Sequence, residues 1–259
     1  MTAFGVAGVP IVSPGDDLSA LILKAIRESD RPLRDHDIVV VTSKVVSRSE
    51  GRFVDLADVV PSERAIQVAC EAGGDARFVE LVLRESVEIS RIAQGAIIAR
   101  HRCGFVVANA GIDRSNVGRS TEVSATSELV LLLPEDSDAS ARAIRAGLMA
   151  GTGRNIAVVI SDSFGRPFRM GTVGVAIGVA GLPPLWDRRG DVDLFGRSLQ
   201  HTVTALADQV AATADLLAGQ ADEARPVIVV RGIQFRAGES GGARDLVRPA
   251  SQDLYARAT

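Results

Sequence analysis

Two aspartates in this chain stand where metal-binding side chains are often found. Asp113 and Asp162 each follow a short apolar run that is typical of a buried strand, and Ser163 stands next to the second of them. Two carboxylates and a hydroxyl form a set of hard oxygen donors, which suits Mg²⁺ or Mn²⁺ bound together with phosphate oxygens. Taken singly, an aspartate in a turn is more often a cap or a turn residue than a metal ligand.

Basic side chains follow the same kind of run. Lys44 and Arg48 come after one buried stretch, and Arg166 and Arg169 come after another. They could neutralise phosphate groups, the arginines in bidentate fashion, although such residues are more often solvated surface groups. The chain has neither a G-x-x-x-x-G-K-[ST] phosphate loop nor a G-x-G-x-x-G fingerprint after a strand. The residues alone therefore indicate a phosphate and a metal but no particular reaction.

The elements that would position these side chains are buried strands and amphipathic helices. Apolar and β-branched runs predict strands within residues 37–47, 96–113 (two strands), 128–135 and 225–232, and at 157–160, after which a polar loop begins. Apolar residues at helical spacing predict helices at 16–29, 62–73, 76–91, 137–153 and 197–219. In open α/β sheets ligands bind beyond the strand ends, which is where the polar residues of this chain gather.

The segment from residue 171 to 197 is rich in glycine yet too apolar for a disordered linker. Gly171, Gly174, Gly178 and Gly181 alternate with valine, alanine and isoleucine. Glycines at this density indicate a close approach of the backbone to another element or to a ligand, or else a bulged or bent strand. The sequence leaves both alternatives open.

Composition narrows the function classes. The 259 residues are 46% hydrophobic, enough for one large core or two small ones, and the formal net charge is −3. This charge and the scattered basic residues argue against a nucleic-acid-binding surface. Two cysteines are too few for a disulfide framework, and the three histidines share no metal-ligand spacing. Without a signal peptide or a membrane-spanning apolar run, we expect a cytoplasmic protein with no membrane partner.

Six segments, in this order, together resemble the coenzyme F-420-0:L-glutamate ligase (coenzyme F-420 gamma-glutamyl ligase) family: GVPIVSPGDDL (8–18), DIVVVTSKVVSRSEGR (37–52), AGIDRSNVG (110–118), VVISDSFGRPFRMGTVGVAIGVAGL (158–182), DLFGRSL (193–199) and RGIQFRAGESGGARDLVRP (231–249). The resemblance implies a mixed α/β (α+β) gamma-glutamyl ligase-like fold in an intertwined homodimer. Residues 1–259 would form a single ligase domain, whole or in two subdomains. The flavin-reductase-like domain that some relatives carry after it is expected to be absent.

The resemblance implies a GTP-dependent ligase. Such an enzyme joins L-glutamate to the lactyl carboxylate of coenzyme F-420-0 and can add further γ-linked glutamates. GTP would convert the carboxylate into an acyl phosphate, which the glutamate amine then attacks. The family requires Mg²⁺ or Mn²⁺ and is associated with K⁺.

The resemblance also implies roles for individual residues. Asp113, Asp162 and Lys44 are expected to be catalytic. The expected metal ligands are Asp113, Asp162, Ser163 and Gln220. The residues expected to bind GTP are Val9, Pro10, Ile11, Val12, Ser43, Lys44, Arg48, Asn116, Ala218, Gly219, Gln220, Ala221, Asp222, Glu223, Ala224 and Arg225. Arg48 stands where the family usually has lysine, and the neutral amide of Gln220 is a poorer metal ligand than a carboxylate.

Other functions fit the same residues. A metal-dependent nucleotide phosphohydrolase could use the two aspartates, although two-metal sites of that kind commonly recruit histidine. A non-catalytic, deazaflavin-binding dimer module could use the glycine-rich stretch as its interface. A ligase with the same chemistry and a different acceptor is a third alternative.

Overall fold

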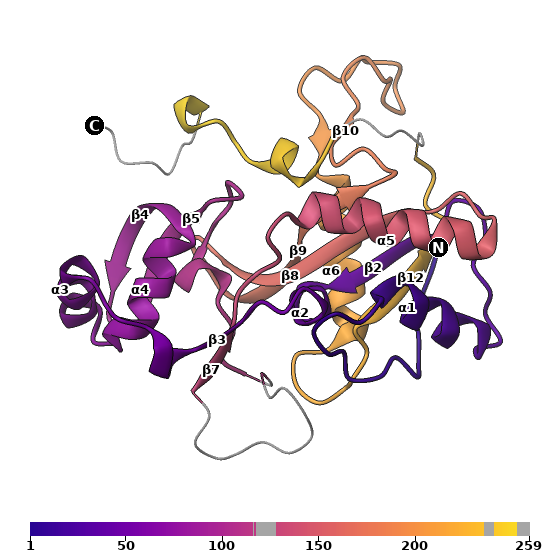
Figure 1. The fold of residues 1–259 in the computed structure, drawn as a ribbon. Coiled ribbons are helices and arrows are strands. Elements are labelled where there is room, and N and C mark those ends of the chain that lie inside the picture. Colours follow the sequence, from indigo (N-terminus) through magenta and orange to yellow (C-terminus); the bar gives the residue numbers. More distant parts are fainter. Residues whose placement is uncertain (116, 118–127, 236–240, 253–259) are drawn as a thin grey trace.

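The computed structural model describes residues 1–115, 117, 128–235 and 241–252 (Figure 1). Its centre is a five-stranded sheet in the order β1-β12-β2-β8-β9. These strands are β1 (Thr2–Gly5), β12 (Val227–Arg231), β2 (Ile38–Thr42), β8 (Ala157–Arg166) and β9 (Arg169–Ala180). β2 and β8 run parallel, and the other neighbouring pairs run antiparallel. The sheet and its helices confirm the expected mixed α/β architecture.

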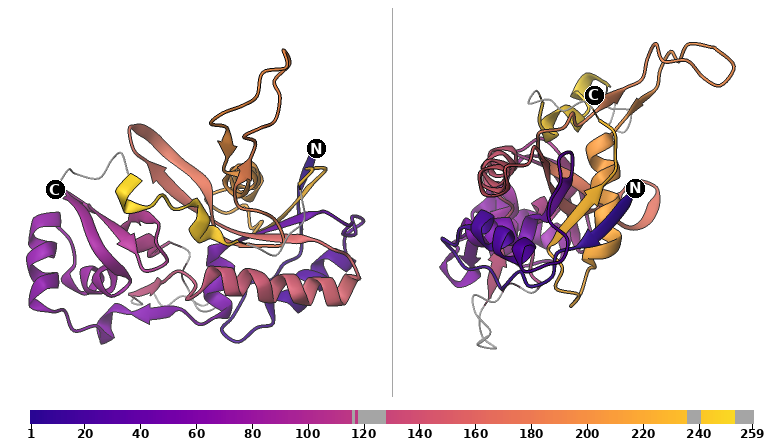
Figure 2. Two further views of the ribbon diagram at one scale, coloured as in Figure 1. Left: turned by 90° about the horizontal axis from the view of Figure 1, so that it is seen from above. Right: turned by 90° about the vertical axis from the view of Figure 1, so that its right-hand side faces the viewer.

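Helices cover both faces of this sheet (Figure 2). They are α1 (Leu18–Arg27) and α5 (Ser137–Thr152) on one face and α6 (Leu206–Ala218) on the other. In β2, Val39 and Val41 pack into the cluster with α1 and α5, whereas Ile38 and Val40 pack into the cluster with α6. The continuous β-branched run is therefore buried on both faces, which is typical of an internal strand.

A second hydrophobic cluster lies beside the central sheet, at the left of Figure 1. The elements around it are α3 (Glu63–Ala72), α4 (Ala76–Arg84), β4 (Ser86–Ala93) and β5 (Ala96–His101), which we call the second region. β6 (Val106–Ala108) pairs with β5, but its Val107 packs into the cluster with α1 and α5. The expected helix over 76–91 is wrong beyond Arg84, because the following residues pair with β5. A register shift between Ile89 and Arg91 lets Ile89 and Ile92 pack on the same cluster at a helix-like spacing.

The remaining elements are short. They are α2 (Ser43–Ser49), β3 (Phe53–Asp55), β7 (Leu129–Leu131), β10 (Trp186–Asp187), β11 (Val203–Thr204) and 3-10 turns at Leu56–Asp58, Asn109–Gly111, Ala243–Leu246 and Ala250–Gln252. The helix expected over 197–219 begins only at Leu206, because β11 pairs with β10. Residues 186–204 instead form an arm that projects from the body (Figure 2). Among the described residues, no helix has the length and apolar character needed to cross a bilayer.

The glycines of β9 let helices approach both faces of the sheet. A Cβ atom on Gly174 would lie 2.6 Å from the carbonyl oxygen of Ala211 in α6. A Cβ atom on Gly178 would collide with the carbonyl of Ser137 at the start of α5. β9 is also irregular, with a register shift against β8. Both alternatives for this segment are thus realised, since it is a bulged strand and a surface for close backbone approach.

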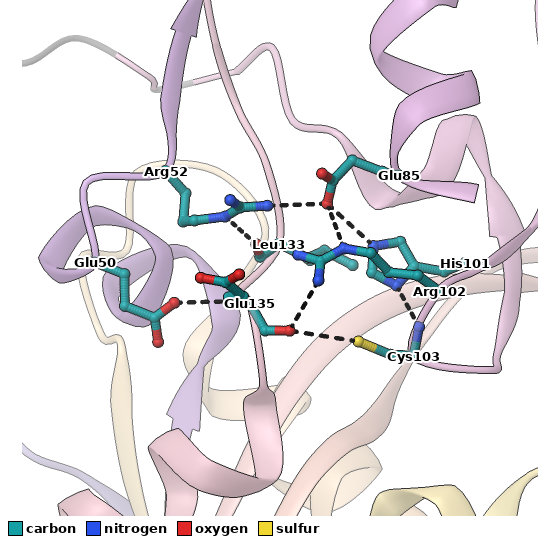
Figure 3. Close-up of polar contacts among 8 residues, drawn as sticks. All are labelled: Glu50, Arg52, Glu85, His101, Arg102, Cys103, Leu133 and Glu135. Atoms are coloured by element: carbon teal, nitrogen blue, oxygen red, sulfur yellow. Dashed lines mark hydrogen bonds and ion pairs between the residues drawn. The ribbon is translucent and has the colours of Figure 1, made fainter. Parts of the chain in front are cut away.

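An ionic cluster connects the second region to the chain segments that follow α2 and precede α5 (Figure 3). Glu85, just after α4, accepts hydrogen bonds from Arg52 at 2.9 Å and from Arg102 at 3.2 Å. The buried His101 ring lies 3.6 Å from the same carboxylate oxygen. Arg52 in turn donates from Nε to the carbonyl of Leu133, in the segment that leads into α5. One carboxylate thus ties together three separate stretches of chain.

Candidate active site

A cavity of about 820 Å³ lies where β2 ends and α2 begins. Most of the residues expected to bind metal or GTP line it: Val9, Pro10, Ile11, Val12, Ser43, Lys44, Arg48, Asp113, Asp162, Ser163, Ala218, Gly219, Gln220, Ala221, Asp222, Ala224 and Arg225. Glu223 is not among the lining residues, and its carboxylate accepts a hydrogen bond from the Ala221 amide at 2.9 Å. Asn116 lies outside the described residues. Segments distant in sequence therefore meet at one cavity.

The turn from β2 into α2 presents Ser43 and Lys44 to this cavity. The strand is apolar through Val41, and Thr42 is the N-cap of α2, so the helix begins without an intervening loop. Val45 and Val46 are buried and hold the helix against the core. The two polar residues are thus fixed at the carboxyl end of a buried strand, which is where α/β sheets bind ligands.

Asp162 lies within β8 and not in a loop after it. The expectation that the strand ends at Ile160 is wrong, because β8 continues to Arg166 as one half of a hairpin with β9. Asp162 stands opposite Val175 in that hairpin. A carboxylate carried by a paired strand is held more rigidly than one on a free loop, which favours a role in binding.

The surroundings of Asp162 make its ionised form unfavourable. Desolvation raises its pKa to about 6 and the negative charge of Asp113 adds to the rise, against the opposing hydrogen bonds from the Ser163 amide and Ser43 and the charge of Lys44. The Ser43 hydroxyl donates to Oδ1 of Asp162 at 3.1 Å. Two carboxylates that repel each other across a cavity are the arrangement that a bound cation would stabilise.

Asp113 is held from two sides. An antiparallel backbone bridge joins it to Leu131, with both hydrogen bonds at 2.9 Å. Lys44 Nζ lies 2.7 Å from Oδ2, while Oδ1 accepts hydrogen bonds from the amide and hydroxyl of Ser115 at 2.7 and 2.8 Å. The lysine and the aspartate expected to be catalytic are therefore in direct contact.

Arg48 lines the cavity but is mostly buried. Its Nε donates to the carbonyl of Val12 at 2.7 Å, and its guanidinium lies 5.2 Å from the centre of the Phe53 ring. Burial lowers the pKa of Arg48. The side chain fastens the loop of residues 9–12 to α2, so it shapes the cavity wall.

A further acidic residue, Asp215, also lines the cavity and was not found from the sequence. It stands in the last turn of α6, where its Oδ1 accepts hydrogen bonds from Ser163 Oγ at 3.1 Å and from Gln220 Nε2 at 2.7 Å. An acid in the last turn of a helix opposes the helix dipole. That mismatch is the signal by which the sequence could have singled out Asp215.

Arg166 and Arg169 are not among the lining residues. They stand at the far end of the β8–β9 hairpin, where Arg166 donates to the carbonyl of Met170 at 3.4 Å. The structure therefore does not bring these two arginines to the aspartates.

The donor set fits a hard divalent cation that is shared with a phosphate ligand. Within the part of the chain that the structure describes, no group of three or more Asp, Glu, His or Cys side chains could hold a metal ion. An ion between Asp113 and Asp162 would have to complete its shell with Ser163, the Gln220 amide, water or phosphate oxygens. Mg²⁺ binds in this way, through one or two carboxylates and the phosphates of a substrate.

Comparison with known proteins gives a consistent result. A model of the family described as F420-0:Gamma-glutamyl ligase matches residues 7–232. The chain is 45% identical over 256 residues to the coenzyme F420:L-glutamate ligase of Methanothermobacter thermautotrophicus, with 98% of each chain covered. It is 39% identical over 247 residues to that of Methanocaldococcus jannaschii, covering 95% of this chain and 94% of the relative. The enzyme of the same name from Halobacterium salinarum is 40% identical over 264 residues, covering 100% and 96%.

Proposed function

Because the chain belongs to the F420-0:gamma-glutamyl ligase family, we propose that it is a GTP-dependent coenzyme F420:L-glutamate ligase. It joins the amine of L-glutamate to the lactyl carboxylate of coenzyme F420-0 and extends the product with γ-linked glutamates. Mg²⁺ or Mn²⁺ and K⁺ are the cations we expect it to use. The observation that carries the proposal is the meeting of Asp113, Asp162 and Lys44 at one cavity.

The reaction divides into two transfers. The carboxylate of the acceptor attacks the γ-phosphorus of GTP, GDP leaves, and an acyl phosphate forms. The glutamate amine then attacks the acyl carbon, phosphate leaves, and the nitrogen loses a proton as the amide forms. The activated intermediate replaces one difficult step by two easier ones. The protein provides positioning and charge in this scheme and no covalent nucleophile.

The residues of the cavity divide these tasks. The divalent cation would be held by Asp113, Asp162, Ser163 and Gln220. When bound, it would offset the negative charge of the GTP phosphates. Lys44, which neutralises Asp113 at 2.7 Å and lines the cavity, would turn its ammonium toward an entering phosphate. The loop of residues 9–12 and the segment 218–225 form the walls around a nucleotide.

A homodimer is part of the proposal. The projecting arm exposes Leu194 and Phe195 almost fully, at 99% and 88%, and the tip of the β8–β9 hairpin exposes Phe168 and Met170. Large apolar side chains concentrated on two protrusions are typical of a protein interface. A second copy of the chain that embraces these protrusions would bury them.

Mass spectrometry of products tests the function. Purified protein with GTP, Mn²⁺, L-glutamate and the unglutamylated coenzyme should yield species heavier by one or more glutamates. Asp113→Asn and Asp162→Asn should each lower the rate by about 100-fold or more while leaving the fold intact. Near-normal turnover in either variant would overturn the assignment of the metal ligands.

Omission of the acceptor separates the alternatives. Rapid release of phosphate from GTP and Mn²⁺ alone would favour a phosphohydrolase. Tight binding of the deazaflavin without nucleotide turnover would favour a binding module. A ligase is expected to release little phosphate until both acceptor and glutamate are present.

A further inference from the structure

Three side chains on one wall of the cavity form a closed set of hydrogen bonds. Gln220 Nε2 donates to Asp215 Oδ1 at 2.7 Å and to Ser163 Oγ at 2.8 Å. Ser163 Oγ also donates to Asp215 Oδ1 at 3.1 Å. All three residues line the cavity, and two of them are expected metal ligands.

The carboxylate fixes how the other two groups face. An ionised carboxylate only accepts hydrogen bonds, so the nitrogen of the Gln220 amide must point at Asp215 and its oxygen must point away. The two hydrogens of that nitrogen are both used, one on Asp215 and one on Ser163. The serine hydrogen is directed at Asp215 as well, so the remaining lone pair of its oxygen is left to accept or to ligate.

A glycine in the neighbouring strand makes this arrangement possible. Gly174 of β9 stands directly opposite Ser163 of β8. A Cβ atom at residue 174 would lie 2.7 Å from Cβ of Asp215 and 2.6 Å from the carbonyl oxygen of Ala211. The absence of a side chain at this position therefore lets α6 pack close enough for Asp215 to reach Ser163.

We propose that Asp215 is a positioning residue, which turns the Ser163 and Gln220 oxygens toward the divalent cation of the nucleotide complex. The inference rests on the proposed function. In this inference Asp215 orients two neutral ligands. A glutamine amide can bind a cation only through its oxygen, so it has to be oriented, whereas either oxygen of a carboxylate could bind the cation. Groups that orient metal ligands commonly change metal affinity by 10- to 100-fold when they are removed.

The test is a double-mutant cycle read out as Mn²⁺ affinity. Free Mn²⁺ is measured by electron paramagnetic resonance in the presence of a non-hydrolysable GTP analogue. Asp215→Ala should raise the Mn²⁺ dissociation constant by about tenfold or more. In the Ser163→Ala, Gln220→Ala background the same change should have less than about a threefold effect, because a residue that acts through others loses its effect when they are gone.

Two further variants serve as a conservative substitution and as a control. Asp215→Asn retains an acceptor oxygen and should weaken Mn²⁺ binding less than Asp215→Ala does. Gln209→Ala changes an exposed residue of the same helix and should leave affinity unchanged. Circular dichroism and thermal unfolding show whether each variant is folded, and Asp215→Asn serves if Asp215→Ala is not.

The possible outcomes separate the inference from the function on which it rests. An equal loss of affinity in both backgrounds would make Asp215 a direct ligand and overturn the inference, as would wild-type affinity in Asp215→Ala. A wild-type protein that glutamylates the coenzyme and binds Mn²⁺ leaves the proposed function standing in either case. A wild-type protein that binds no Mn²⁺ with the analogue overturns both.

Discussion

Asp162 is costly for the stability of the fold, whereas the proposed function gives its carboxylate a role in binding a cation. Its side chain is half-buried in β8, and desolvation together with Asp113 raises its pKa to about 6. Because the folded state holds this proton more tightly than the unfolded state, stability falls as pH rises from about 4 to about 6. Above about pH 6 the ionised carboxylate lowers the free energy of unfolding by its full amount, unless a bound cation offsets the charge.

Removing this charge should therefore stabilise the metal-free protein. We expect Asp162→Asn, in the presence of a chelator at pH 7.5, to unfold with a free energy higher by on the order of 2 kcal/mol. The advantage should disappear at pH 4, where the wild-type carboxyl is protonated. Urea unfolding at both pH values measures the difference in stability between the variant and the wild type. Asp30→Asn, at an exposed position, is the control for loss of one acidic charge. A less stable Asp162→Asn at pH 7.5 would contradict this reading.

Glu85 shows the opposite pH dependence. Burial alone would raise its pKa, but His101, Arg52 and Arg102 outweigh that effect and lower the pKa to about 2 (Figure 3). A lowered pKa means that the stabilisation is present above the ordinary value of 4.5 and is lost as pH falls toward 2.

The Glu85→Gln variant tests this sign. It should be less stable than wild type at pH 7 by on the order of 3 kcal/mol, and the difference should shrink steadily below pH 4.5. Glu88→Gln removes a carboxylate that is 60% exposed and pairs with Arg100 at 3.4 Å, and it should cost less than about 0.5 kcal/mol. Urea titrations from pH 7 to pH 3 compare the two. A gap for Glu85→Gln that stays constant with pH would exclude the ionic role.

The acidic residues of the candidate site show how much of it the sequence could predict. Asp113 and Asp162 could be singled out because each carboxylate follows an apolar run, and both line the cavity. Asp215 was missed because it lies within a helix whose apolar stripe accounts for its neighbours. Its partner Ser163 comes from a distant strand, and contacts of that kind depend on how elements pack and not on local pattern.

At the scale of elements, local periodicity predicts where elements are but not always which kind they are. The spacing of Ile89 and Ile92 is that of a helix, yet a bulge in β4 produces it. The polar residues after Ile160 have the composition of a turn, yet pairing with β9 keeps them extended to Arg166. In both places a neighbouring strand decided the conformation, because backbone pairing outweighs weak local preference.

The close packing of helices on β9 gives a test at this scale. Gly178→Ala places a methyl group against the backbone at the start of α5. We expect it to cost about 1–3 kcal/mol of stability, because backbone on the far side of the contact has little room to move. Gly74→Ala is the matched control, since a Cβ there meets no atom within 4 Å and should be tolerated. Equal unfolding temperatures for the two variants would show that β9 can shift to accept the methyl group.

At the scale of the whole molecule, large apolar side chains are exposed on two protrusions, and a single chain does not cover them. Leu194 and Phe195 of the arm are almost fully exposed. Isolated apolar side chains are normal on protein surfaces, but a projecting arm (Figure 2) with two adjacent ones would gain free energy by burial against a partner.

Changing these two residues tests the proposed homodimer. We expect the wild type to sediment as a dimer and the Leu194→Ser, Phe195→Ser variant as a monomer at the same concentration, because burying two such side chains in each subunit contributes about 1.5–3 kcal/mol apiece. Its metal-free unfolding temperature should also lose any dependence on protein concentration, since only an oligomer couples stability to concentration. Substitution of the exposed Val60 by serine, outside the arm, controls for loss of surface apolarity. A wild-type monomer, or a double variant that stays dimeric, would remove the arm from the interface.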